Sequence, residues 1–491
     1  MATPIPKNRA RFTVEQIADA TAGAVLRPGG PSIGVSTDSR ALDQGAAFVA
    51  LVGEHFDGHA FLSAARAAGA ATLVVSRDES SNDASSAVVR VADTRQALGD
   101  LAREHRRRWQ RAPHPDGARS IVAITGSAGK TTTKTVLAGL LEALFPGATL
   151  ATAGNLNNDV GLPMTLFGLE PEHRFGVLEL GTNAPGEIGR LADIARPDVA
   201  VLTLVAAAHT EKLGSVANVA TEKGALLAAL GEDGLAVVNA DDPLVMGELG
   251  RSKARRRIAY GFSPDADYRI LRREPSGALE STITLMRPAG PVDLKYPLLG
   301  DAGALAVTAA VAVVEGLLGR ALPQSDLDRA LAELPPSGAG RLAVVALKDG
   351  TVIIDDSYNA NPASMRSSIA TAIELASREG RRLVLVLGEM RELGALAASE
   401  HAALGQVVAR AGAASVIGVG GHAERLVFEA ASPAAPSLFA PDSNRAIPIV
   451  LAHVESGDLV LVKGSRGVAT ERIVEALAAA RGGRAGERST A

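Results

Sequence analysis

The chain has 491 residues, of which 47% are hydrophobic, 21% are charged and 3% are aromatic, and its formal net charge is -4. This near-neutral balance gives no bulk electrostatic reason to bind nucleic acid or an anionic membrane, and the absence of cysteine excludes thiol catalysis, disulfides and thiolate metal sites. The length predicts about three domains, each large enough for its own core.

The N-terminal part, residues 1–115, is predicted to form a small α/β domain. Residues 1–11 are polar and contain proline, unlike an export signal, so we expect a cytoplasmic protein. Thr13 can cap a helix while the side chain of Gln16 reaches back to it. The other predicted elements are strands at 47–51 and 72–75, a helix at 60–68 and a Pro/Gly-rich linker at 111–117.

The second predicted domain, residues 116–335, opens with a phosphate-binding loop. A short apolar strand precedes the loop and a helix-compatible stretch, residues 134–144, follows it; the loop itself reads Thr125-Gly126-Ser127-Ala128-Gly129-Lys130-Thr131-Thr132. Glycines let a turn aim backbone N–H groups at one point, Lys130 adds positive charge, and Thr131 offers a hydroxyl to Mg²⁺. The pattern GxxxxGK[ST] would put glycine where this chain has Ile124, so the loop is a shorter relative of that form. The pattern predicts a nucleoside triphosphate site; the alternative is an ordinary Gly-rich turn with a surface lysine.

Strands and helices alternate after the loop, which predicts a parallel sheet whose ligands gather at the carboxyl ends of its strands. The strands are expected at 121–124, 175–180, 199–204 and 235–238, with helices at 186–195 and 216–230. Extended runs follow at 268–271, 281–286 and 292–298, where we expect an antiparallel flap beside the sheet, and then a helix at 304–318. His209 and Glu315 interrupt the longest apolar stretches before they reach membrane-spanning length, so no membrane insertion is expected.

Two strand ends carry groups that suit a metal ion. Glu179 closes one predicted strand and His209 follows the next, so both are expected near the Thr131 hydroxyl. A hard cation takes oxygen ligands, and a transferring phosphoryl group needs its charge neutralised, which makes these two side chains candidates to hold Mg²⁺. The alternatives are a structural glutamate and a histidine buried in packing.

The third predicted domain, residues 336–491, repeats the strand and helix alternation, with strands at 352–355, 383–387, 416–419 and 459–462. A Pro/Gly-rich linker at 335–340 precedes it, and we expect residues 481–491 to be disordered. The predicted fold class is therefore α/β with three domains: a small N-terminal α/β domain, a central P-loop domain with a parallel sheet, and a C-terminal Rossmann-like doubly wound domain.

Several runs of residues together resemble the Mur ligases of bacterial peptidoglycan synthesis. They are the phosphate loop, Asn155 to Pro163, Glu179-Leu180-Gly181, Ala208-His209-Thr210-Glu211, Asn239-Ala240-Asp241-Asp242, Gly340-Arg341-Leu342, Asp356 to Pro362 and Lys463 to Arg466. The resemblance covers nearly the whole chain. Within the family it is strongest to the member that adds D-alanyl-D-alanine to UDP-N-acetylmuramoyl-tripeptide, and the runs from Asn155 and Asp356 are the most particular to that branch.

The resemblance implies ATP and Mg²⁺ as cofactors and assigns roles to individual residues. ATP would be bound by Gly126, Ser127, Ala128, Gly129, Lys130, Thr131, Thr132, Asn239, Asp242, Arg341 and Asp356. The UDP-muramyl substrate would be bound by Thr37, Asp38, Ser39, Arg40, Asn157 and Asn158, and Tyr358 and Asn359 would also contact substrate. Thr131, Glu179, His209 and a carbamylated Lys223 would hold metal, and Lys130, Glu179, His209 and Lys223 would be catalytic.

Some of these positions also have a plain structural alternative. Lys223 is by default a solvated lysine on a helix, residues 37–40 form a polar turn, Arg341 is a cation in a linker, and Asp356 is a turn former at the end of a strand.

Two positions depart from the family pattern. Where the branch usually has Gly-x-His-Asn-x-x-Asn, this chain reads Gly300-Asp301-Ala302-Gly303-Ala304-Leu305-Ala306-Val307, so side chains expected near the nucleotide are missing. The usual Gly-Asp-Met before Glu-Leu-Gly is Gly388-Glu389-Met390, in a loop expected to face the incoming amine.

The implied activity is an ATP-dependent, amide-forming ligation through an acyl phosphate, with UDP-N-acetylmuramoyl-tripeptide and D-alanyl-D-alanine as substrates and a monomeric enzyme. One alternative is another Mur-type or folylpolyglutamate-type amino acid ligase, which would share the phosphate and metal residues. The other is a non-catalytic nucleotide-binding homologue, favoured only by the missing asparagines.

Overall fold

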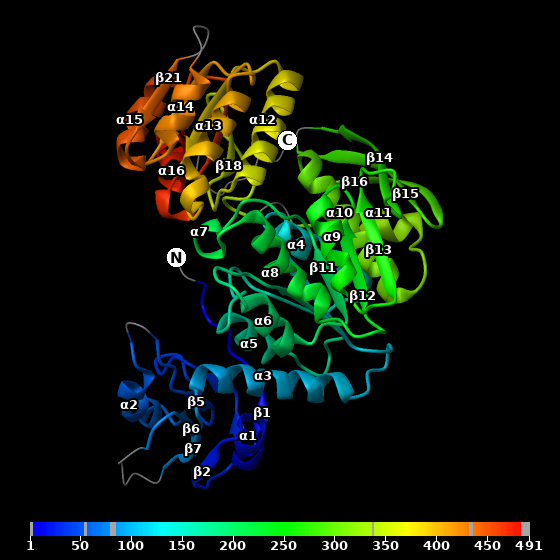
Figure 1. Cartoon of the computed structure of the whole chain (residues 1–491), viewed down its shortest axis with the longest axis vertical. Coiled ribbons are helices and arrows are strands. Elements are labelled where there is room, and N and C mark those ends of the chain that lie inside the picture. The colour runs from blue at the N-terminus through cyan, green and yellow to red at the C-terminus, as the bar shows by residue number, and fades with distance from the viewer. Residues whose placement is uncertain are drawn as a thin grey trace.

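A computed structural model of the chain describes residues 3–53, 56–78, 85–277, 279–335, 338–431 and 436–482. Three α/β bodies follow one another in chain order along the long axis of the molecule (Figure 1). Part of the predicted linker, residues 336–337, and the tail from residue 483 lie outside the described residues.

The N-terminal body contains a five-stranded sheet in the order β2-β7-β6-β5-β4 and a separate β1–β3 pair. Its strands are β1 (Arg11–Phe12), β2 (Ala24–Arg27), β3 (Ser32–Ile33), β4 (Val35–Ser36), β5 (Ala47–Val49), β6 (Thr72–Val75) and β7 (Ala87–Arg90). Its helices are α1 (Val14–Thr21), η1 (Gly58–Phe61), α2 (Leu62–Ala67) and the long α3 (Thr94–Arg111). The predicted capping of α1 is confirmed, because Thr13 and Gln16 form a reciprocal capping box.

The central body is built on a nine-stranded sheet in the order β16-β15-β14-β13-β12-β11-β8-β10-β9. Its strands are β8 (Ser120–Thr125), β9 (Thr149–Ala151), β10 (Phe175–Glu179), β11 (Val199–Leu202), β12 (Leu235–Asn239), β13 (Arg256–Gly261), β14 (Tyr268–Pro275), β15 (Ser281–Arg287) and β16 (Gly290–Tyr296). Strands β8 to β14 pair in parallel, and the alternation predicts this for β8, β10, β11 and β12.

The three extended runs do not form a flap beside the sheet, as the sequence led us to expect. They pair antiparallel among themselves, but β14 also pairs with β13, so they continue the same sheet. The reason is β13, which the sequence pattern did not reveal and which supplies the edge that β14 extends.

Helices cover both faces of the central sheet (Figure 1). They are α4 (Lys130–Leu144), α5 (Gly161–Leu166), α6 (Glu187–Ala195), α7 (Thr210–Leu213), α8 (Val216–Ala228), α9 (Pro243–Glu248), η2 (Leu249–Arg251), α10 (Gly300–Leu318) and α11 (Gln324–Ala332). Contrary to expectation, α10 is long and apolar enough to cross a membrane despite Glu315, but 72% of its most apolar window is buried. Helix α10 packs against α4, α12 and the sheet, which identifies it as a core helix.

The C-terminal body is a six-stranded sheet in the order β17-β18-β22-β19-β20-β21, parallel except for β17. Its strands are β17 (Ala343–Ala346), β18 (Val352–Asp356), β19 (Leu383–Gly388), β20 (Ser415–Val419), β21 (Ser437–Ala440) and β22 (Leu459–Lys463). Its helices are α12 (Pro362–Glu379), η3 (Gly394–Leu396), α13 (Ala397–Val408), α14 (Ala423–Ala430), α15 (Ser443–His453), η4 (Arg466–Val468) and α16 (Glu471–Ala480). The predicted α/β class with a Rossmann-like last body is confirmed.

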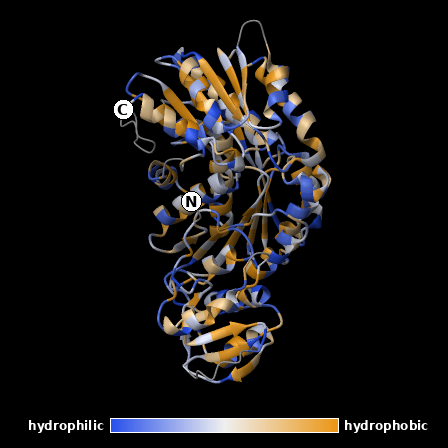
Figure 2. Ribbon diagram, turned by 90° about the vertical axis from the view of Figure 1, so that its left-hand side faces the viewer, coloured by the Kyte–Doolittle hydropathy of each residue, from blue (hydrophilic) through white to orange (hydrophobic). Residues whose placement is uncertain are grey.

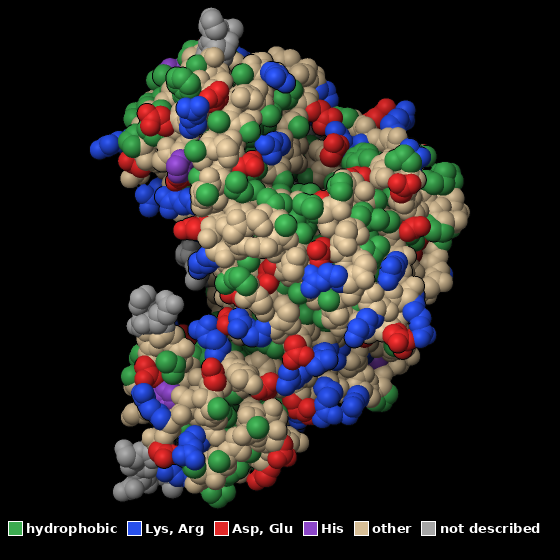
Figure 3. All heavy atoms as spheres, viewed as in Figure 1, with side chains coloured by type: hydrophobic (Ala, Val, Ile, Leu, Met, Phe, Trp, Pro, Cys, Tyr) green, Lys and Arg blue, Asp and Glu red, His purple; other side chains and the backbone are tan. Residues whose placement is uncertain are grey.

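The cores of the three bodies lie between sheets and helices. The strands of the two larger sheets are largely hydrophobic, whereas the helices combine apolar and polar residues (Figure 2). The space-filling view shows the N-terminal body standing off from the other two, which leaves one side of the molecule concave (Figure 3). The carboxyl ends of the central strands face the C-terminal body, and this junction positions the site.

Candidate functional site

The phosphate loop takes its shape from two glycines. Strand β8 ends at Thr125, and Gly126 follows with φ +155, where a Cβ would lie 1.9 Å from Thr203 Oγ1. Gly129 has φ +83 and is the N-cap of α4, so the loop delivers the chain directly into a helix N-terminus. Both conformations favour glycine, and the resulting turn leaves backbone N–H groups for an anion at the positive end of the helix.

Thr203 holds this loop in place, a role that the sequence did not reveal. Its hydroxyl donates a 2.6 Å hydrogen bond to the carbonyl of Ala128, and its side chain lies against Gly126 and Gly129. Thr203 follows β11, the neighbour of β8 in the sheet. The contact between Thr203 and the loop depends on the pairing of β11 with β8, so it could be predicted only once that pairing is known.

Lys130 points back onto its own loop. Its Nζ donates to the carbonyl of Gly126 at 2.7 Å. Burial lowers the pKa of Lys130, while the nearby carboxylate of Glu179 acts in the opposite direction. A phosphate would satisfy this amino group better than a single neutral carbonyl can.

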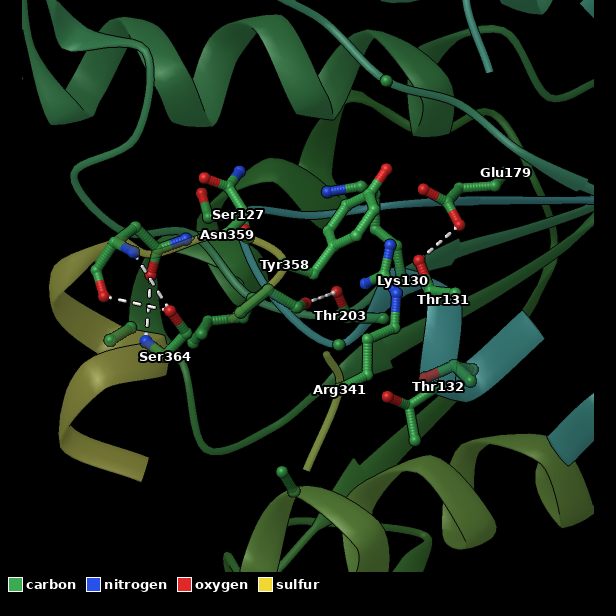
Figure 4. A pocket seen from close by; sticks show the side chains of 18 of the residues that line it. Ser127, Lys130, Thr131, Thr132, Glu179, Thr203, Arg341, Tyr358, Asn359 and Ser364 are labelled. Atoms are coloured by element: carbon green, nitrogen blue, oxygen red, sulfur yellow. Dashed lines mark hydrogen bonds between the residues drawn. The ribbon is translucent and has the colours of Figure 1, made fainter. Parts of the chain in front are cut away.

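A buried carboxylate lies beside the loop, where the sequence predicts it. Thr131 Oγ1 donates to Glu179 Oε2 at 2.7 Å (Figure 4), and Asn157 Nδ2 donates to Glu179 Oε1 at 2.9 Å. Glu179 is only 3% exposed. Since both of its oxygens face polar partners at the cavity, the carboxylate is oriented before any ligand arrives.

These groups line a cavity of about 700 Å³ between the central and C-terminal bodies. Of the residues predicted for the site, it brings together Ser127, Ala128, Gly129, Lys130, Thr131, Thr132, Asn157, Asn158, Glu179, His209, Asn239, Arg341, Asp356, Tyr358 and Asn359. The predicted residues outside its lining are Gly126, Asp242, Lys223, Thr37, Asp38, Ser39 and Arg40.

The C-terminal body contributes one wall. The Arg341 guanidinium lies 4.0 Å from the centre of the Tyr358 ring, over its face. Asp356 accepts from Lys463 Nζ at 2.5 Å and from Ser368 Oγ at 2.6 Å, so it is an anchored strand-end carboxylate.

A contact between the two bodies touches the phosphate loop itself. Asn361 Nδ2 donates to the carbonyl of Ser127 at 2.9 Å. The sequence motif containing Asn361 gave no sign of this contact, because the partners are 234 residues apart.

Two residues predicted to contact the nucleoside already have polar partners. Asn239 Nδ2 donates to the carbonyl of Thr203 at 2.9 Å, although Asn239 still lines the cavity. Asp242 caps α9, and its second oxygen accepts from Val205 N at 2.7 Å. Asp242 is thus committed to backbone groups in this conformation.

Lys223 is a core residue and not a solvated lysine. It is 1% exposed on α8, and its amino group makes no hydrogen bond among the residues that the structure describes. Burial lowers the pKa of Lys223 well below its usual value, and the positive charge of Lys130 acts in the same direction. Both effects favour the neutral, nucleophilic form of this amine.

His209 lies where the first cavity meets a second one of about 690 Å³. Its Nδ1 is 2.5 Å from Glu392 Oε2 of the C-terminal body. The interaction with His209 lowers the pKa of Glu392. The second cavity also includes Glu389 and Arg391 from a loop of the C-terminal body and Arg466 from the start of η4.

The N-terminal tetrad, residues 37–40, lies apart from both cavities. Arg40 is exposed, and its guanidinium donates to both oxygens of Asp38, at 2.9 and 2.7 Å. This pairing lowers the pKa of Asp38. The tetrad forms a solvated turn whose charged groups are available to a ligand on that surface.

The missing asparagines leave an apolar wall. Ala302 and Ala306 of α10 line the first cavity at positions where the branch usually carries His and Asn, and Leu305 lines it beside them. Asp301 also lines it, and its carboxylate accepts a hydrogen bond from Arg273 Nε at 2.6 Å.

The donor set at the loop suits Mg²⁺. The described residues contain no cluster of three or more His, Cys, Asp or Glu side chains arranged to hold a metal. Thr131 and Glu179 nevertheless present two hard oxygen groups side by side at the phosphate loop. Magnesium typically binds through one or two carboxylates together with phosphates and water, and this pair fits that pattern.

Comparisons with known proteins agree across the chain. Family models match at residues 33–106 (Mur ligase family, catalytic domain), 124–314 (Mur ligase middle domain) and 340–466 (Mur ligase, glutamate ligase domain). The UDP-N-acetylmuramoyl-tripeptide--D-alanyl-D-alanine ligase of Escherichia coli (strain K12) is 37% identical, over 95% of this chain and 98% of its own. A crystal structure of MurF from Acinetobacter baumannii has a TM-score of 0.84 at 31% identity, covering 97% of this chain and 99% of that one. MurF ligase from Thermotoga maritima in complex with ADP has a TM-score of 0.76 at 28% identity, covering 90% and 96%.

Proposed function

This chain belongs to the Mur ligase family, and we propose on that premise which of its residues carry out the ligation. It is an ATP-dependent ligase that joins D-alanyl-D-alanine to UDP-N-acetylmuramoyl-tripeptide and releases ADP and phosphate. The observation that supports the site is the phosphate loop with its Thr131–Glu179 pair, in a cavity that Arg341 and Tyr358 close from the C-terminal body.

The chemistry explains why a phosphate site is needed. A carboxylate is a poor acyl donor toward an amine, so the terminal carboxylate of the tripeptide first attacks the γ-phosphate of ATP, giving an acyl phosphate and ADP. The amine of the dipeptide then attacks the acyl carbon, and the tetrahedral intermediate expels phosphate as the amide forms. Charge develops on phosphoryl and carbonyl oxygens in both steps.

The residues around the loop would stabilise that charge. Lys130 would move from the Gly126 carbonyl to the phosphate oxygens, and the positive end of α4 would act on the same group. Thr131 and Glu179 would hold Mg²⁺, with His209 as a further ligand, and the ion would supply charge neutralisation at the transferring phosphoryl group. Arg341, with no carboxylate partner among the described residues, would pair with phosphate.

Lys223 is proposed to be carbamylated. A neutral buried amine forms an N–C bond with CO₂ and releases a proton, which gives a carbamate anion that can assist in holding metal. The low pKa and burial of Lys223 support this assignment. Equilibration of the enzyme with ¹³CO₂ should give a carbamate carbon signal that is lost in Lys223→Arg.

The substrates would span the molecule. We place the UDP group at residues 37–40, where Arg40 can exchange Asp38 for a phosphate, and the muramyl peptide near Asn157 and Asn158. The dipeptide would enter through the second cavity, where Arg391 and Arg466 offer half-exposed guanidinium groups for its carboxylate. The ATP and UDP-linked substrates support a cytoplasmic reaction, and we propose a monomer.

Product analysis tests the function directly. Incubation with UDP-N-acetylmuramoyl-tripeptide, D-alanyl-D-alanine, ATP and Mg²⁺ should give the pentapeptide by mass spectrometry, and Lys130→Ala should abolish it. Lys253→Ala, a matched change at an exposed lysine of the same body, should leave turnover intact. Near-normal ligation by Lys130→Ala would contradict the scheme.

A panel of amines separates this activity from its alternatives. ADP release with glutamate or another single amino acid, and not with D-alanyl-D-alanine, would indicate a different amino acid ligase. Nucleotide binding without any turnover would indicate a non-catalytic homologue.

A further inference from the structure

Two residues in the left-handed backbone region face each other across the junction of the central and C-terminal bodies. His209, which caps α7, has φ +56, and Glu392, between β19 and η3, has φ +64. Non-glycine residues in this region are strained and cluster at functional sites. His209 is used in the proposed metal site, whereas no role has been given to Glu392.

Around His209, the described residues make one side-chain contact and two contacts that involve backbone between the two bodies. His209 Nδ1 lies 2.5 Å from Glu392 Oε2. Glu211 N donates to the Glu392 carbonyl at 3.0 Å, and Thr210 Oγ1 donates to the Leu393 carbonyl at 3.0 Å. Because the last two contacts use carbonyl groups of the loop, they persist when the Glu392 side chain is changed. The carboxylate is therefore not required to hold the bodies together.

The polar partners of the His209 imidazole decide which of its two nitrogens is free to accept a ligand. Among the described residues, Nδ1 has no polar partner except the Glu392 carboxylate, and Nε2 makes no hydrogen bond. The Nδ1 contact has the distance of a charge-assisted hydrogen bond but not its alignment, as is common at sites that tighten only when ligand binds. A proton on Nδ1 facing the carboxylate leaves the Nε2 lone pair available at the phosphate cavity.

We infer that Glu392 is a positioning residue: it fixes the Nδ1–H tautomer of His209 and thereby presents Nε2 as a ligand toward the nucleotide-bound metal. Metal-ligating histidines typically donate their other N–H to a carboxylate, a backbone carbonyl or water, and here a carboxylate occupies that position. Here that carboxylate comes from a different body, so the histidine is oriented only when the C-terminal body is docked. The part of this inference that makes His209 a metal ligand rests on the proposed function, whereas the tautomer of His209 does not depend on it.

The tautomer can be measured in the enzyme without nucleotide or metal. The full chain is labelled with ¹⁵N-histidine, and the His209 signals are assigned by their loss in His209→Gln. The wild type and Glu392→Gln, whose amide oxygen still accepts, should show Nδ1–H, whereas Glu392→Ala should shift toward the Nε2–H form. Glu424→Ala, which removes an exposed carboxylate from the same body, is the control and should match the wild type. A wild-type signal with the proton on Nε2, or one that Glu392→Ala does not change, overturns the inference.

Kinetics test the consequence for the metal. Glu392→Ala should raise the apparent KM for Mg²⁺ by about 10- to 100-fold, and Glu392→Gln should recover most of the loss. In a His209→Ala background, Glu392→Ala should have no further effect, because Glu392 acts through the imidazole. An equal loss in both backgrounds would assign Glu392 a different role. Failure of the wild type to ligate would instead overturn the proposed function and leave the tautomer result standing.

Discussion

The hydroxyl of Thr203 is the clearest test of how the phosphate loop is held. It donates to the carbonyl of Ala128 at 2.6 Å, and its longer 3.3 Å contact to Thr125 O cannot share the same proton equally well. In a trans peptide the C=O and the N–H point to opposite sides. Holding the Ala128 carbonyl against Thr203 therefore directs the N–H of Gly129 away from Thr203, and Gly129 lines the cavity.

Thr203→Val keeps the shape of the side chain and removes the donor. A typical hydrogen bond contributes about 0.5–1.5 kcal/mol, and an acceptor left without a partner costs about 1–3 kcal/mol. Since Ala128 is only partly buried, we expect Thr203→Val to lose about 1.5 kcal/mol of binding free energy for the nucleotide. This loss corresponds to about tenfold weaker binding. Thr203→Ser retains the donor and should bind nearly as the wild type does.

Titration calorimetry with Mg²⁺–ADP and the KM for ATP provide two independent measurements. The melting temperature without nucleotide should fall by only a few degrees, because about 1.5 kcal/mol is small beside the unfolding enthalpy of a domain of this size. If Thr203→Val binds nucleotide like the wild type, or if Thr203→Ser loses as much as Thr203→Val, this account of the loop is wrong.

Three further outcomes follow from the geometry. Gly126→Ala would place a Cβ 1.9 Å from a neighbouring oxygen at a residue with φ +155, so nucleotide binding should be lost. Gly231→Ala, at a glycine with open space around it, should leave binding unchanged. Calorimetry compares the two variants. Asn157→Ala removes the donor to Glu179 Oε1 and should raise the apparent KM for Mg²⁺ about tenfold. The KM is measured by Mg²⁺ titration at saturating ATP. An unchanged KM would mean that the Asn157 amide does not orient the Glu179 carboxylate. Burial lowers the pKa of His105 from 6.5 to about 4. As the pH drops from 6.5 to 4, the unfolded chain binds a proton at this histidine before the folded protein does, so the free energy of unfolding decreases. The decrease is about 2 kcal/mol at pH 5. His105→Gln should flatten that loss when urea unfolding is compared at pH 5 and 7.5, and an unchanged slope would refute the assignment.

The phosphate loop could be predicted from the sequence because its parts are contiguous. A strand, two glycines, Lys130, Thr131 and a helix follow one another within about 25 residues, and local geometry alone aims them at one point. The parallel sheet was equally predictable from the alternation of strands and helices, which also placed Glu179 at a strand end near the loop. In these cases the positions of the residues along the chain are enough to predict which of them lie close together in the fold.

Other features depended on contacts between distant segments, and spacing along the chain does not encode them. The register of β11 beside β8 brings Thr203 under the loop, and the docking of two bodies brings Asn361 to Ser127 and Glu392 to His209. The burial of Lys223 likewise results from the packing of α8, since its neighbours in sequence are typical of an exposed helix.

Thus the sequence by itself determined the fold class, the family and the chemistry at the loop, because each follows from short motifs and their order. Only the tertiary structure decided which side chains orient that chemistry, because a hydrogen bond between residues far apart in the chain requires that strand register and domain docking be fixed first.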